Sequence, residues 1–86
     1  MDSEIEYLRR EEHYYSSDLG LACALVTHGH SLIALERSSA TKAEFIFKRC
    51  PALEAEVSRY WSKESVSDLR SYFENLKMLK NRIYSE

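Results

Sequence analysis

Apolar and polar residues alternate in two short segments near the middle of the chain, 31–37 and 43–49. Ile33 and Leu35 are two positions apart in the first segment, and Phe45 and Phe47 are two positions apart in the second. A period of two is typical of strands with one apolar face. The residues between the segments include no Gly or Asn for a tight turn, so the pattern predicts a β-hairpin with a longer loop.

The apolar residues of both strands must face the same side of this hairpin. In each cross-strand pair, the two residue numbers must therefore add up to an even number. A sum of 80 places Leu35 opposite Phe45, but it also places Glu36 opposite Glu44. Like charges directly opposite each other are unfavourable. A sum of 82 places Leu35 opposite Phe47 and separates the two carboxylates. We therefore predict the register whose sum is 82.

A buried helix is predicted from Asp18 to His28. Asp18 can accept hydrogen bonds from the free amides of the first turn. In the helix that follows, apolar residues occupy almost the whole circumference, as in a buried helix. Gly29 stands where a left-handed C-terminal cap is expected. Gly20 lies inside the helix and costs about 1 kcal/mol relative to Ala, which a close approach of another element would explain.

Two amphipathic helices are predicted after the hairpin. The first begins at Pro51, since proline suits the first helical position, and ends near Lys63. Its apolar stripe consists of Leu53, Val57, Tyr60 and Trp61, and its outer face of Glu54, Glu56 and Arg59. The second begins at Ser65, with Asp68 three positions on as in a capping box, and ends near Tyr84. Its apolar stripe consists of Leu69, Tyr72, Phe73, Leu76, Leu79 and Ile83.

The N-terminal residues 1–14 are dense in charge. Ser3 and Glu6 fit a capping box, so we predict a charged arm that is helical. Residues 15–86 then form a single compact domain. The elements together predict an α+β fold, in which a β-hairpin is covered by about three helices in the order (α)-α-β-β-α-α.

The composition narrows the function classes. The 86 residues include 12 basic and 14 acidic ones, which is no basic signature for nucleic acid. The two cysteines are too few for a disulfide framework and favour a reduced, cytoplasmic setting. No apolar run has the length of a membrane span, and the N-terminus is charged, unlike a signal peptide, so no membrane partner is expected.

Two histidines and two cysteines suggest a metal site at first sight: Cys23, His28, His30 and Cys50. A structural zinc site needs four converging ligands. Cys23 and His28 are five positions apart, so they do not share a helix face. His30 and Cys50 are expected to meet near the open end of the hairpin, which leaves the set incomplete. We predict no metal and no other cofactor.

Catalytic patterns are also missing from the sequence. There is no glycine-flanked Ser, no Gly-rich phosphate loop and no HExxH motif. Glu36 and Glu44 are expected on a solvated face of the hairpin. We predict that the protein is not an enzyme.

Basic residues near the hairpin and on the last helix make nucleic acid an alternative partner: Lys42, Lys48, Arg49, Lys77, Lys80 and Arg82. Phosphate binding needs several clustered cations. Around the last helix Lys80 and Arg82 lie on opposite flanks, so no single basic ridge results. An accessory DNA- or RNA-binding role is therefore the second hypothesis.

Aromatic residues are more numerous than so small a core can bury, with six Tyr, three Phe and one Trp. Aromatic side chains concentrate in protein interfaces. The predicted interface residues are Tyr60, Trp61, Tyr72, Met78 and Tyr84. The nearly heptad stripe of the last helix also suits a partner helix, and a free hairpin edge can pair across a homodimer.

Several short apolar and aromatic motifs resemble those of a small family of uncharacterised bacterial and phage domains. The motifs are residues 15–22, Phe45-Ile46-Phe47, Tyr60-Trp61, Tyr72-Phe73, Leu76-Lys77 and residues 80–84. The resemblance covers roughly residues 14 to 85. It implies a domain of unknown function in a microbial, phage or mobile-element setting, and it supplies no active site.

These observations favour a small non-catalytic interaction module in the cytoplasm. Its expected partner is a protein or a second copy of the chain, bound through aromatic helix surfaces or a hairpin edge.

Overall fold

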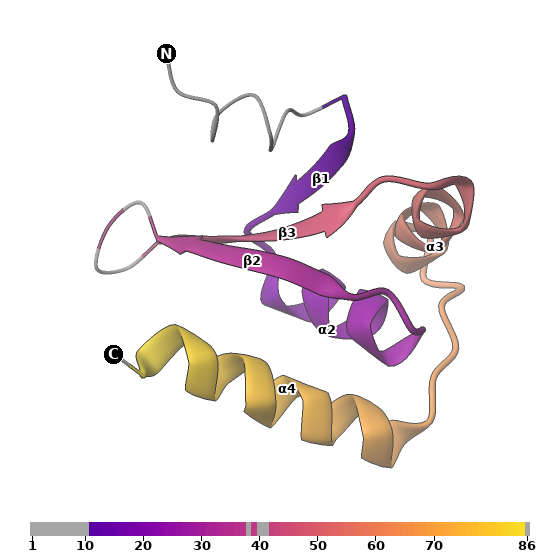
Figure 1. Cartoon of the computed structure of the whole chain (residues 1–86). Helices are drawn as coiled ribbons and strands as arrows, with labels where there is room; N and C mark the ends of the chain where they lie inside the picture. Colours follow the sequence, from indigo (N-terminus) through magenta and orange to yellow (C-terminus); the bar gives the residue numbers. More distant parts are fainter. Residues whose placement is uncertain (1–10, 38, 40–41, 86) are drawn as a thin grey trace.

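The computed structural model describes residues 11–37, 39 and 42–85. Within these ranges three strands and three helices form an α+β fold (Figure 1). The strands are β1 (His13–Ser16), β2 (Leu32–Arg37) and β3 (Ala43–Lys48), and the helices are α2 (Leu19–Thr27), α3 (Pro51–Trp61) and α4 (Leu69–Tyr84). The predicted α+β class and the β2–β3 hairpin are confirmed.

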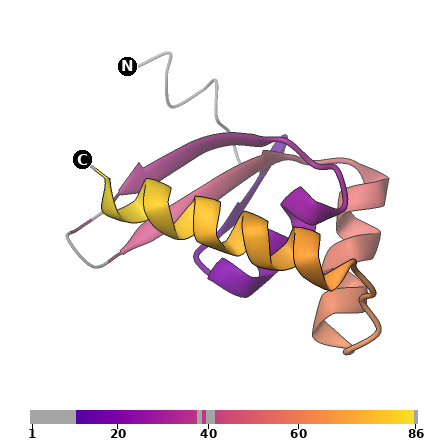
Figure 2. The ribbon, with the colours of Figure 1, turned by 90° about the horizontal axis from the view of Figure 1, so that it is seen from below.

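Helix α2 is the centre of the packing. It lies with α4 on one side of the antiparallel sheet, and α3 lies beyond the end of β3 (Figure 1, Figure 2). Its residues Leu21–Leu25 are all buried. They contact core residues from the sheet, from α3 and from α4: Phe45, Phe47, Leu53 and Leu79.

Strand β1 was not predicted from the sequence. It pairs with β3, so the sheet order is β1-β3-β2 and β3 lies in the middle. Tyr14 is opposite Phe47 and packs against the core. The predicted helical arm falls mainly on residues 1–10, which lie outside the described residues, but His13 and Tyr14 from its end belong to this strand.

The hairpin register differs from the prediction. Leu35 is opposite Phe45 and Glu36 is opposite Glu44, which is the sum of 80 and not 82. A register shift between Leu32 and Ala34 then makes Ile33 the extra residue of a bulge and exposes its side chain. Leu32 and Leu35 thereby both pack against the core. The gain from this burial outweighs the repulsion between two carboxylates, which is weak near water.

The C-terminal helices also differ in detail from the prediction. Helix α4 begins at Leu69 rather than Ser65, because Asp68 is its N-cap and accepts a hydrogen bond from the Ser71 amide at 2.9 Å. Its buried or half-buried apolar residues are Tyr72, Leu76, Leu79 and Ile83. Leu69 and Phe73, predicted in the same stripe, are exposed, as is Trp61 of α3. Glu56, predicted on the outside of α3, is buried.

Arg37, at the end of β2, joins the hairpin to the C-terminal end of α4. Its guanidinium donates to the carbonyls of Arg82 at 3.2 Å and Ser85 at 3.3 Å, and also to that of Ile83. A cation suits this helix end, where the last carbonyls have no partner within the helix.

Gly20 allows two tyrosines to approach α2 closely. The Tyr72 hydroxyl donates to the Gly20 carbonyl at 3.2 Å, and a Cβ at position 20 would overlap the Tyr60 hydroxyl. This contact explains a glycine inside a buried helix. The predicted C-terminal cap of α2 is present as well, since Gly29 has a φ of +96°.

Gly20→Ala is expected to lower the free energy of unfolding by about 1–2 kcal/mol, although Ala favours helices, because the new methyl group overpacks against Tyr60. In a Tyr60→Phe background the overlapping oxygen is gone, and the same substitution should be neutral or stabilising. Urea unfolding of the four proteins in this double-mutant cycle measures the difference. Equal effects of Gly20→Ala in both backgrounds would contradict the proposed contact.

Candidate functional site

Large apolar side chains are exposed where α3 is joined to α4. Trp61 ends α3 and is 58% exposed, Val66 in the connecting loop is 79% exposed, Leu69 begins α4 and is 84% exposed, and Phe73 one turn later is 56% exposed. We call these four residues the α3–α4 corner. Exposed apolar residues that occur singly are ordinary, but a group of them marks an interaction surface.

A pocket of about 220 Å³ lies at this corner. Its lining combines α2, α3, the connecting loop and α4: Ala24, Tyr60, Ser65, Ser67, Leu69 and Tyr72. Trp61 stands beside it, with its ring edge-on to Tyr60 at a centroid distance of 5.1 Å. Val66 lies between the two lining serines. The pocket therefore borders the corner, and Leu69 belongs to both.

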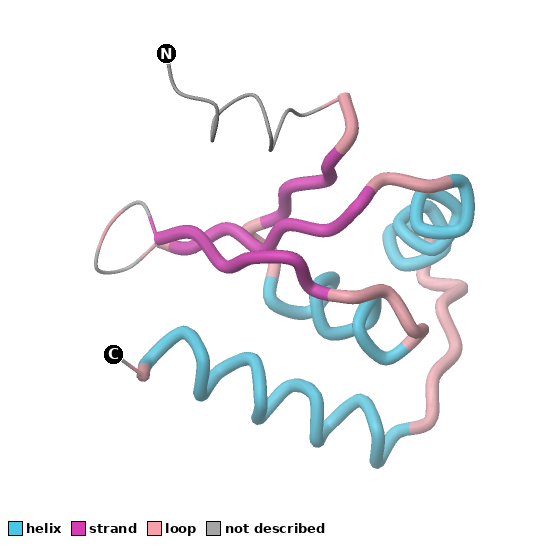
Figure 3. The backbone as a smooth tube through the Cα atoms, viewed as in Figure 1, coloured by secondary structure: helices cyan, strands magenta, loops and turns pink. Residues whose placement is uncertain are grey.

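Glu56 holds in place the loop that joins α3 to α4, which is drawn in pink in Figure 3. Its carboxylate, 1% exposed, accepts hydrogen bonds from Ser65 Oγ at 2.5 Å and from the Arg59 guanidinium at 2.8 and 3.0 Å. His28 Nε2 lies 3.4 Å from the same carboxylate and 3.2 Å from Ser67 Oγ. Both serines that line the pocket are therefore fixed by side chains of α3 and of the α2 cap.

Burial alone would raise the pKa of Glu56. Hydrogen bonds from Ser65 and Arg59, together with the charges of His28 and Arg59, outweigh it, so the pKa is lowered below its ordinary value of 4.5. Glu56 is thus held in its ionised form.

Ser67, His28 and Glu56 do not form a catalytic triad. Serine and carboxylate both approach Nε2 of His28, whereas in a triad they contact opposite ring nitrogens. Cys23 is no better a nucleophile, because burial raises the pKa of its thiol, which donates to the Tyr72 carbonyl at 3.0 Å. The polar groups near the corner support the loop and show no arrangement for nucleophilic catalysis.

Tyr60 and Tyr72 both line the pocket and are half-buried. Burial raises the pKa of both phenols, so both remain neutral at physiological pH. Of the five predicted interface residues, the structure brings together Tyr60, Trp61 and Tyr72 at the corner.

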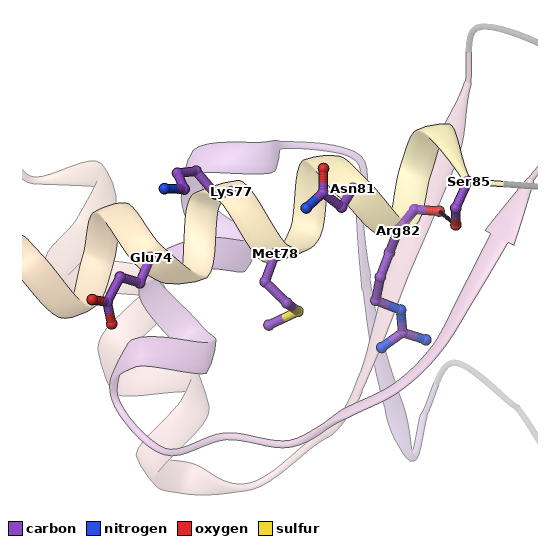
Figure 4. A pocket seen from close by; sticks show the side chains of 6 residues that line it. All are labelled: Glu74, Lys77, Met78, Asn81, Arg82 and Ser85. Carbon is purple, nitrogen blue, oxygen red and sulfur yellow. Dashed lines mark hydrogen bonds between the residues drawn. The ribbon is translucent and has the colours of Figure 1, made fainter.

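The two other predicted interface residues lie elsewhere. Met78 lines a shallow hollow of about 430 Å³ along α4, together with Lys77 and Arg82 among others (Figure 4). Tyr84, at the end of α4, lines a separate pocket of about 250 Å³ with Arg37 and Lys42.

The basic residues of the nucleic-acid hypothesis are distributed over the molecule. Lys42 begins the β3 side of the hairpin, whereas Lys48 and Arg49 follow at its other end, about 20 Å away at the usual rise per residue. Arg49 contacts Glu54 at 2.8 Å and lies over the Tyr14 ring. The three others lie along α4: Lys77, Lys80 and Arg82. The six therefore form no single cluster.

The histidine and cysteine positions also separate. His30 and Cys50 line one pocket at the open end of the hairpin, as expected, whereas Cys23 is buried beneath Tyr72 and His28 contacts Glu56. In the part of the chain that the structure describes, no three His, Cys, Asp or Glu side chains are placed to hold a metal ion. Within the same residues, no helix has both the length and the apolar content to cross a membrane.

A family model for a domain of unknown function, DUF5659, matches residues 11–85, from just before β1 to just after α4. The chain belongs to the DUF5659 family. No curated protein and no solved structure was found to match it. The predicted resemblance to a domain of unknown function is confirmed. The α3–α4 corner of this DUF5659 domain lies entirely within the matched range.

Sequence reasoning missed several residues of the corner. The apolar pattern predicts Leu69 and Phe73 in the core stripe of the last helix, and it places Glu56, which supports the corner from below the loop, on the outside of α3. Val66 was not singled out, although an apolar residue between two serines in a linker was a usable signal. An apolar residue in a linker belongs to no amphipathic helix, so no helix packing buries its side chain.

Glu56→Gln is expected to lower the free energy of unfolding at pH 7 by about 1–3 kcal/mol, because it removes a buried charge from three partners that remain. Since the folded-state pKa is lowered, the stabilisation by ionised Glu56 is complete above about pH 4.5 and is lost as the pH falls through that lowered pKa. The gap between wild type and Glu56→Gln should therefore narrow with falling pH.

Urea unfolding from about pH 7 down to pH 3 checks this. Glu64→Gln, at an exposed position, is the control and should follow the wild type. A gap between wild type and Glu56→Gln that stays constant over this range would refute the role of the Glu56 charge.

Proposed function

We propose that this DUF5659 domain is a small non-catalytic interaction module that binds a protein partner through the α3–α4 corner. The observation that carries the proposal is the group of four exposed apolar side chains beside an aromatic pocket. Contiguous apolar surface rimmed by polar residues is typical of protein interaction sites. Trp and Tyr are also the residue types that most often dominate binding energy.

The arrangement suits an apolar anchor residue of the partner. The anchor would enter the pocket and pack against Tyr60 and Tyr72, while Trp61 and Val66 would cover it from the rim. Because Glu56 already fixes the loop that carries Val66, little conformational entropy is lost when the partner binds. Preorganisation of this kind raises affinity without additional contacts.

A setting for the module follows from two further observations. The resemblance to bacterial and phage domains favours a bacterium, a phage or a mobile element as its source. Cys23 and Cys50 are free thiols, which favours a reduced compartment such as the cytoplasm.

An accessory role in DNA or RNA binding has weaker support. The basic residues are divided between two ends of the hairpin and α4, and Arg49 is paired with Glu54. Phosphate-driven binding depends on several cations acting together.

A photo-crosslinking amino acid at Val66 tests the proposal in cells of the source organism. We expect a crosslinked adduct with a defined protein, identified by mass spectrometry together with its crosslinked residue. The same amino acid at Ala55, exposed on the outer side of α3, is the matched control and should give no such adduct.

Leu69→Asp and Trp61→Ala should each weaken binding of the identified protein by about tenfold or more, because each removes a central apolar contact. Both side chains are exposed, so the fold should be retained. Identical adducts from positions 66 and 55, or full binding by both variants, would exclude the corner as the interface.

A further inference from the structure

A pocket of about 250 Å³ lies where the end of β2, the start of β3, the start of α2 and the end of α4 meet. We call it the hairpin pocket. Its polar side chains come from these different elements: Ser17, Arg37, Lys42 and Tyr84. The pocket is at the opposite end of α4 from the α3–α4 corner (Figure 1), so its ligand is independent of the partner proposed for the corner.

Arg37 is held in the hairpin pocket by the end of α4. Its Nη2 donates to the carbonyls of Arg82 at 3.2 Å and Ser85 at 3.3 Å, and also to that of Ile83. These acceptors carry no net charge, so they leave the positive charge of Arg37 without an ion pair. Among the described residues, no group accepts a hydrogen bond from its Nε or Nη1. The guanidinium is therefore fixed by one nitrogen and has N–H groups on the other two for a ligand.

The register of the hairpin keeps acidic side chains out of this pocket. Glu36 and Glu44 are opposite each other and alternate with Leu35 and Phe45, which pack on the core side of the sheet. Successive side chains of a strand face opposite sides, so both carboxylates lie on the other side. The Asp18 carboxylate caps α2, where it accepts from the Leu21 amide at 2.9 Å. None of the described residues that line the pocket is acidic.

Lys42 supplies a second positive charge. Arg37 is opposite Ala43, which is the residue next to Lys42 in the chain. Within the described part of the chain, the Lys42 ammonium makes no ion pair and the hydroxyls of Ser17 and Tyr84 make no hydrogen bond. Two like charges in one pocket repel each other, and an anion between them replaces this repulsion by two attractions. The lining is thus complementary to a negative charge.

We propose that the hairpin pocket binds a small organic anion, in which a carboxylate or a phosphate is attached to an apolar group. The anionic head would lie between Arg37 and Lys42, and the hydroxyls of Ser17 and Tyr84 would donate to its other oxygens. The apolar group would pack against the half-buried side chains that line the same pocket, Leu19 and Ile83.

The size of the pocket limits the ligand. Its volume is below the range of about 300–1,000 Å³ that is usual for ligand pockets, so one ring or a short aliphatic chain is the apolar group that fits. Because Arg37 is already oriented by α4, little conformational entropy of this side chain is lost on binding. So small a ligand buries little surface, and we expect a dissociation constant of about 0.1–1 mM.

NMR titration of the full ¹⁵N-labelled chain measures both the affinity and the place of binding. The probes are phenyl phosphate and phenylacetate, each added up to about 10 mM. At least one should bind, with the largest shifts at the amides of Ser17, Arg37 and Tyr84. Benzyl alcohol, which has the ring without the charge, should bind at least about tenfold more weakly. The tighter of the two anions shows whether the site prefers a phosphate or a carboxylate.

Lys42→Gln should raise the dissociation constant of the preferred anion at least about fivefold, because it removes one of the two charges. Lys48→Gln is the matched control: it changes the net charge equally, but Lys48 is exposed at the other end of β3 and does not line this pocket. At physiological salt it should bind like the wild type, since screening weakens charges beyond about 8 Å. Arg37→Gln would also disturb the end of α4, so Lys42→Gln is the deciding variant.

Several results would overturn the anion site. These are no shift changes with either anion at about 10 mM, equal affinity of the wild type and Lys42→Gln, or equal affinity for benzyl alcohol and the anions. Shifts centred on other residues would place the binding elsewhere. A single-stranded DNA 20-mer that binds more tightly than either anion, and is weakened equally by Lys42→Gln and Lys48→Gln, would replace the site by general attraction to phosphate.

Discussion

The burial of α2 on every side is the constraint on which the rest of the structure depends. A helix that is apolar around nearly its whole circumference needs more cover than a two-stranded hairpin can provide. The sheet covers one side, with β1 widening it, and α3 and α4 cover the others. Gly20 completes this arrangement, because the absence of a side chain lets Tyr60 and Tyr72 close over the start of the helix.

The exposed surfaces follow from a difference in helix length. Helix α2 has 9 residues and α4 has 16, or about 14 and 24 Å, so α4 is longer than the helix it packs against. Its central residues Tyr72, Leu76 and Leu79 contact the core. Leu69 and Tyr84 are its first and last residues and are left exposed. Leu69, the first residue of α4, is therefore an apolar part of the corner that the core does not cover.

The sequence pattern predicted the hairpin, all three helices and most of the core. Apolar residues that recur every 2 positions in a strand or every 3.6 positions in a helix lie on one face, and that face is usually the buried one. The pattern gave the wrong residue where more apolar positions were available than the core could bury. In β2 the bulge favours Leu32 over Ile33, and a period of two carries no information about bulges. In α4 six apolar positions span about 120° at the ideal rotation, and Leu69 and Phe73 lie at one margin. Glu56 was misplaced because its partners Ser65 and His28 are distant in sequence.

The hydrogen bond between the Tyr72 hydroxyl and the Gly20 carbonyl joins residues 52 positions apart. Arg37 and the end of α4 are likewise 45 to 48 positions apart. Contacts of such sequence separation require a long loop to close, which slows folding relative to local structure. The β2–β3 hairpin is local by comparison. We therefore expect the contacts of α4 to form later in folding than the local contacts of the hairpin.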